Sequence, residues 1–97
     1  MSSYRHFIIQ TYENYGEPSN KRIRARALPG QGVATDRKVE CSEEMRLSHP
    51  VGSCFKVECK ITNRDGGTPF LYRHHSWPYE LLTQEESEDF IQKNFPN

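Results

Sequence analysis

The pattern that most constrains this chain is the alternation of apolar and charged residues along GSCFKVECKIT, residues 52–62. Every second position is apolar, and the positions between hold lysine or glutamate. The apolar positions are Phe55, Val57, Cys59 and Ile61. Because successive side chains of a strand point to opposite faces, the alternation predicts a strand with one buried and one solvated face. The following NRDGG predicts a turn, so TPFLYRHH, residues 68–75, is expected to return as an antiparallel partner.

Other segments carry weaker local signals of regular structure. β-branched and aromatic residues predict a strand over residues 4–13, and alternation predicts a second over KRIRARAL, residues 21–28. ATDRKVEC, residues 34–41, is a weaker strand candidate. CSEEMRLSHPVG, residues 41–52, predicts one short helical turn, because Ser42 can cap its first amide hydrogens and Pro50 bars its continuation. SWPYELL, residues 76–82, is expected to form a connector.

The final segment predicts a C-terminal helix over about residues 84–94. Thr83 and Glu86 have the spacing of a capping box, and the acidic residues of the first two turns suit the positive end of the helix dipole. The apolar stripe of this helix is narrow and consists of Ser87, Phe90, Ile91 and Phe95.

These elements fit a single domain spanning residues 1–97. Five short strands and a terminal helix predict an α+β fold, either a small antiparallel sheet or a partly closed five-stranded barrel of the SH3 or OB type. Antiparallel pairing is expected because the connections are too short for β-α-β crossovers. The hydrophobic content is only 34%, but five Phe, five Tyr and one Trp compensate, since each buried ring removes about 150–250 Å² from water.

The net charge of zero hides an asymmetry along the chain. Residues 1–38 hold seven basic against three acidic residues, whereas residues 83–97 hold one against four. The basic front can attract an anionic partner, and the acidic tail can be that partner within the same molecule.

The basic front contains an unusual strand in which arginine occupies every second position. Arg22, Arg24 and Arg26 are separated by Ile23 and Ala25, so a strand would present the three guanidinium groups on one face. Alternate residues of a strand lie about 6.5–7 Å apart, close to the spacing of successive phosphates on an extended single strand. We expect an anion-binding face here, which Arg37 and Lys38 extend. The alternative is an ordinary solvated face, or one paired with the acidic helix.

A second candidate surface is the rim segment YRHHSWPYE, residues 72–80. Tryptophan and tyrosine contribute strongly to interface energetics, so this segment predicts a protein-interaction surface made by His74, His75, Trp77 and Tyr79. The alternative is that Trp77 and Pro78 plug one end of the core, and most aromatic residues of the chain are expected to be core residues.

No motif predicts catalysis, a metal site or a cofactor. His74 and His75 are adjacent and would point to opposite faces of a strand, and no Cys-x-x-Cys or His-x-x-x-His spacing occurs. Neither a nucleophile elbow nor a glycine-rich phosphate loop is present. No apolar run approaches the roughly 18 residues of a membrane span, and three cysteines are typical of reduced thiols. We therefore expect a cytoplasmic protein that is not an enzyme and does not bind a membrane.

The sequence leaves three functions open. The first is a small non-enzymatic binding domain whose basic strand takes an anionic partner, most plausibly single-stranded nucleic acid. The second is a protein-interaction module that uses the Trp/Tyr/His rim. The third is a globular protein whose role the sequence does not reveal.

Overall fold

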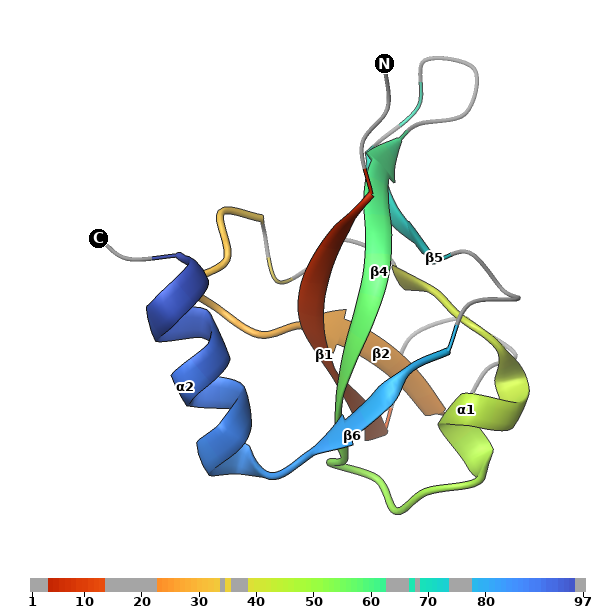
Figure 1. Ribbon diagram of the computed structural model, residues 1–97. Coiled ribbons are helices and arrows are strands. Elements are labelled where there is room, and N and C mark those ends of the chain that lie inside the picture. Colours follow the sequence, from red (N-terminus) through yellow and green to blue (C-terminus); the bar gives the residue numbers. More distant parts are fainter. Residues whose placement is uncertain are drawn as a thin grey trace.

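The computed structural model describes residues 4–13, 23–33, 35, 39–62, 67, 69–73 and 78–95. Six strands and two helices follow one another along these residues (Figure 1). They are β1 (Arg5–Glu13), β2 (Ile23–Ala27), β3 (Val39–Glu40), α1 (Glu43–Leu47), β4 (Cys54–Thr62), β5 (Phe70–Arg73), β6 (Glu80–Leu82) and α2 (Gln84–Asn94).

The strands form a nearly closed barrel with a C-terminal helix beside it. Their order in the sheet is β2-β1-β4-β5-β3, and β6 pairs with β4 outside this path. β2 and β3, at the two ends of the order, lie in contact and bring the sheet almost to closure. The expected small α+β barrel with a C-terminal helix is therefore confirmed.

The pairing differs from expectation at β3 and β5, which run parallel, with Val39 opposite Leu71 and Glu40 opposite Tyr72. Residues 41–69 between them contain α1 and β4, and this length allows the chain to return in the same direction. The strand expected over residues 34–41 is reduced in the described residues to the two residues of β3.

The expected connector over residues 76–82 is also wrong in part, because its last three residues form β6. β5 pairs with β4 only from Cys59 to Thr62, which leaves the Cys54–Lys56 part of the same edge open to another strand. β6 fills that position antiparallel, with Leu81 opposite Phe55.

The apolar side chains at alternate strand positions fill the barrel interior, as the alternation predicts. Phe55, Val57 and Cys59 of β4 are all almost completely buried. The core cluster consists of Phe7, Ile9, Ala25, Ala27, Val39, Met45, Phe55, Val57, Cys59 and Leu71. Ile61 departs from the predicted pattern and is 53% exposed, because within the described residues β1 pairs with β4 only as far as Cys59.

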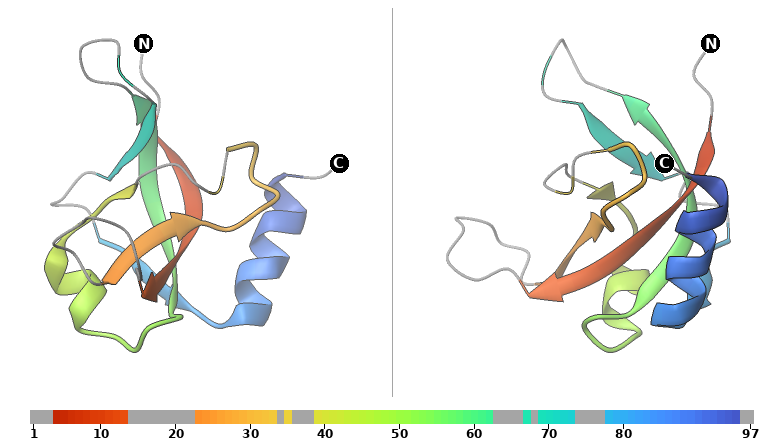
Figure 2. Two further views of the ribbon diagram at one scale, coloured as in Figure 1. Left: turned by 180° about the vertical axis from the view of Figure 1, so that it is seen from behind. Right: turned by 90° about the vertical axis from the view of Figure 1, so that its left-hand side faces the viewer.

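A second, smaller layer lies between the barrel and α2. Ile8 points to the outer face of β1, yet its exposed fraction is 0%. Its partner Lys56 on β4 places its amine 5.6 Å from the ring centroid of Phe90 on α2. α2 packs against β4 and β6 (Figure 2). Phe95 at its end stacks on the core residue Phe7, with the ring centroids 6.1 Å apart.

Both helices begin where the sequence predicts. Ser42 caps α1 by accepting a hydrogen bond from the Met45 amide, and Thr83 and Glu86 form the capping box of α2. Ser87 of the predicted stripe is fully buried, which confirms that this side of α2 faces the barrel. Within the described ranges, neither helix is long and apolar enough to cross a membrane.

A buried glutamine joins β1 to the segment that follows β2. The Gln31 side chain is 2% exposed, and its Oε1 accepts a hydrogen bond from the Ile8 amide at 2.6 Å. Its Nε2 donates to the carbonyls of Ile8 at 2.8 Å and Leu28 at 2.9 Å. The carboxamide therefore replaces a strand neighbour where the chain turns away from β1, and it satisfies buried backbone groups that would otherwise lose free energy.

We predict that Gln31→Met, which keeps the shape but removes these hydrogen bonds, lowers the free energy of unfolding by about 2–3 kcal/mol, because the Ile8 amide is left buried without an acceptor. Urea denaturation measures this change. The control is Gln10→Met, which removes an exposed side-chain hydrogen bond to the Gly52 carbonyl and is expected to cost less than about 1 kcal/mol. Equal losses in the two variants would contradict the role of Gln31.

Candidate functional site

The outer surface of the β1–β2 pair carries the described part of the predicted arginine strand. Ala25 and Ala27 are buried, whereas Arg26 is exposed and Arg24 is half-buried, as the alternation predicts. In the β1–β2 register Tyr12 is opposite Arg24 and Gln10 is opposite Arg26. We call these four residues, Gln10, Tyr12, Arg24 and Arg26, the arginine face.

The arginine face contains a cation–aromatic contact that the sequence did not predict. The guanidinium carbon of Arg26 lies 4.7 Å from the ring centroid of Tyr12, its diagonal neighbour across the strand pair. Stacking holds the planar guanidinium against the ring, while its N–H groups stay available at the edge of the plane. Tyr12 thus reduces the conformational freedom of an exposed arginine.

The acidic helix packs on a different part of the barrel. α2 lies against β4 and β6, and β1 separates β4 from β2 in the sheet. Figure 2 shows α2 beside the barrel, without crossing β2. The carboxylates of its first two turns belong to exposed residues, namely Glu85, Glu86, Glu88 and Asp89.

The other predicted anion-binding residues, Arg22, Arg37 and Lys38, lie outside the described residues. Arg46, which the sequence analysis did not single out, is 8% exposed and donates from Nη1 to the Ile23 carbonyl at 2.6 Å. This hydrogen bond ties α1 to the start of β2. Its structural role explains why this arginine does not add to the exposed charge.

Of the predicted rim surface, only Tyr79 lies within the described residues; His74, His75 and Trp77 lie outside them. The Tyr79 ring makes edge contacts with Phe55 at 5.4 Å and with His49 at 6.0 Å. The Arg73 guanidinium carbon lies 5.3 Å from its centroid. Tyr79 is half-buried against the core, and its use as an interaction surface stays a prediction.

A second cation–aromatic cluster lies near the other end of β1. The Lys60 amine is 5.4 Å from the ring of Tyr4 and 5.8 Å from the ring of Tyr72. Tyr72 lies directly opposite Lys60 in the β4–β5 register. Lys60 lies on the solvent-facing side of β4, as the alternation predicts. The sequence does not reveal the strand register that brings the two tyrosine rings next to it.

The inward-facing row at that end of the barrel is chemically unusual. Cys59 lies between Arg5 of β1 and Arg73 of β5 in the strand registers. Burial raises the pKa of the Cys59 thiol from 9.0 to about 12; Cys41 adds to this rise, and Arg73 opposes it. The thiol therefore stays protonated in the folded protein at neutral pH.

Among the described residues, no three His, Cys, Asp or Glu side chains are grouped to hold a metal ion.

Comparison of the chain with family models, with curated proteins and with solved structures found no match. The arrangement of its own side chains is therefore the basis for proposing a function.

The Cys59 pKa predicts an alkaline loss of stability. The folded pKa of about 12 lies above the ordinary value of 9.0, so the native state holds a proton that the unfolded state releases. This contribution is fully present below pH 9 and is lost between pH 9 and about 12, with a slope of up to about 1.4 kcal/mol per pH unit. Denaturation of wild type and Cys59→Ala over this range measures the contribution, because other groups titrate in both proteins. Parallel stability curves would contradict it.

Proposed function

We propose that this protein is a small non-enzymatic binding domain whose arginine face takes an anionic partner, and that single-stranded nucleic acid is the partner that fits it best. The observation that carries the proposal is the exposed Arg26 guanidinium stacked 4.7 Å over Tyr12. A guanidinium that packs over a ring can still offer its N–H donors, and this planar group suits the bidentate recognition of a phosphate.

The spacing along β2 supports a strand-like ligand. Arg24 and Arg26 are two residues apart on one strand, a separation of about 6.5–7 Å. Two successive phosphates of an extended single strand can meet the two side chains in register. A contact of this kind recognises the backbone and carries little sequence preference.

The barrel type gives independent support, as an analogy at the level of the fold. OB barrels bind oligonucleotides on the face formed by their second and third strands and on the adjoining loops. The arginine face lies on β2 and β1, next to that position. A fold hosts many functions, so the side chains of the face carry more weight than the analogy.

The acidic charge of α2 bears on the length of the ligand. Its four exposed carboxylates lie beside the barrel rather than on β2, and they repel phosphates that pass near them. The second cluster at Lys60 is separated from Tyr12 by the length of β1, which for nine residues is about 30 Å. The proposed site therefore contacts a short stretch of a few nucleotides.

We predict that affinity for a fluorescent mixed-sequence oligonucleotide falls steeply between low and moderate salt, because phosphate contacts release bound counterions. In Arg26→Gln the plot of log affinity against log salt should become shallower by about 0.7–1 unit, and affinity should fall. Replacing Arg22, Arg24 and Arg26 together by serine should abolish binding. Fluorescence anisotropy measures both quantities.

The matched control is Lys93→Gln, which removes one positive charge from the last turn of α2. It should leave the salt slope unchanged. Binding that survives the triple serine substitution would contradict the proposed site, and binding that hardly responds to salt would favour an aromatic-anchored protein contact instead.

A further inference from the structure

A pocket of about 320 Å³ lies on the outer surface of β4, away from β2. Its described lining comes from three strands and the segment that enters β6, and consists of His6, Lys56, Glu58, Pro78, Tyr79 and Glu80. β5 ends opposite Cys59 and β6 begins opposite Lys56, so the pocket lies where the edge of β4 passes from one partner strand to the other.

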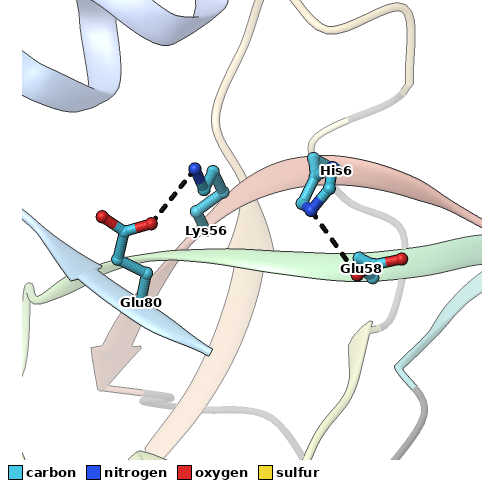
Figure 3. Close-up of polar contacts among 4 residues, drawn as sticks. All are labelled: His6, Lys56, Glu58 and Glu80. Atoms are coloured by element: carbon cyan, nitrogen blue, oxygen red, sulfur yellow. Dashed lines mark ion pairs between the residues drawn. The ribbon is translucent and has the colours of Figure 1, made fainter. Parts of the chain in front are cut away.

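One ion pair and one histidine–carboxylate contact, which is an ion pair only when the histidine is protonated, line this pocket (Figure 3). His6 Nε2 lies 3.6 Å from a Glu58 carboxylate oxygen, and the Lys56 amine lies 3.1 Å from a Glu80 oxygen. The β1–β4 register places His6 directly opposite Glu58, and the β4–β6 register places Lys56 opposite Glu80. Strand pairing therefore places the two members of each pair next to one another.

The charges of the lining favour a cationic ligand. Among the described lining residues, Lys56 supplies one positive charge, Glu58 and Glu80 supply two negative charges, and His6 adds a charge only when it is protonated. The Lys56 amine is engaged with Glu80 and also lies 5.6 Å from the Phe90 ring. Glu58 is neutralised only when His6 is protonated, so a carboxylate remains available at the pocket. An anion would face two carboxylates and one lysine that is already occupied.

We propose that this pocket binds the basic side chain of a peptide, a guanidinium or an ammonium group on an apolar stem. Glu58 accepts charge-assisted hydrogen bonds from the cation, and the stem packs against the exposed ring of Pro78. The site is separate from the arginine face, takes a ligand of the opposite charge, and does not depend on the proposed nucleic-acid binding.

The test is a titration of the full chain with N-acetyl-arginine amide, followed by amide chemical shifts. Binding should shift the signals of His6, Lys56, Glu58 and Glu80. Glu58→Gln should weaken the affinity about fivefold, because it keeps the shape of a half-exposed side chain and removes its charge. The matched control Glu44→Gln removes a charge from an exposed position on α1 and should leave the affinity unchanged.

Two further ligands separate the parts of the proposal. Methylguanidinium, which lacks the stem, should bind more weakly than N-acetyl-arginine amide, and N-acetyl-glutamate amide should not bind. Equal affinity for the two guanidinium compounds would overturn the contact with Pro78. Undiminished binding in Glu58→Gln, binding of the acidic compound, or no shifts at the pocket would overturn the site.

Discussion

The structure depends on the burial of both faces of β1. Phe7, Ile8 and Ile9 are consecutive, and none is more than 1% exposed. Consecutive side chains of a strand point to opposite faces, so Phe7 and Ile9 fill the barrel while Ile8 needs a cover outside it. α2 packs against the neighbouring β4 and β6, and its Phe90 ring lies beside Lys56, the β4 partner of Ile8. A strand buried on both sides thus fixes where the C-terminal helix must pack.

That constraint also determines which surfaces stay available. Once α2 occupies the outer side of β4 and β6, the acidic end of the chain is committed to one flank of the barrel. Gln31 then holds the segment after β2 against Ile8, and a Cβ atom at Gly30 would come within 3.2 Å of the Ile91 side chain. The close approach of this segment to α2 leaves β2 itself, with Arg24 and Arg26, outside the helix contact.

Much of this architecture could be predicted from local patterns. Alternation correctly identified β2 and β4, and the capping residues located both helices. The parallel pairing of β3 with β5 could not be predicted, because it depends on two residues brought together by the closure of the barrel. β6 was missed for a related reason, since three residues become a strand only where β4 offers an unpaired edge. Phe7 to Ile9 carried a signal for burial on both faces, but three residues are too few to distinguish it from ordinary alternation.

The candidate sites were less predictable than the fold. The alternation alone predicts that Arg24 and Arg26 project to the outside of the barrel, and the structure agrees. The contact between Arg26 and Tyr12 depends on the register of β1 with β2, which no local pattern specifies. The same is true of Glu58, whose partner His6 lies 52 positions earlier in the sequence. Pairing of distant strands brings together each of these sets of side chains.

We propose that the outer surface of β2 and β1 binds the anionic partner. The most direct test is to map amide chemical shifts during titration with a mixed-sequence single-stranded oligonucleotide. Binding at this surface predicts progressive shifts at Gln10, Tyr12, Arg24 and Arg26 that are reversed by added salt. Shifts confined to other strands, or no shifts at low salt, would contradict it.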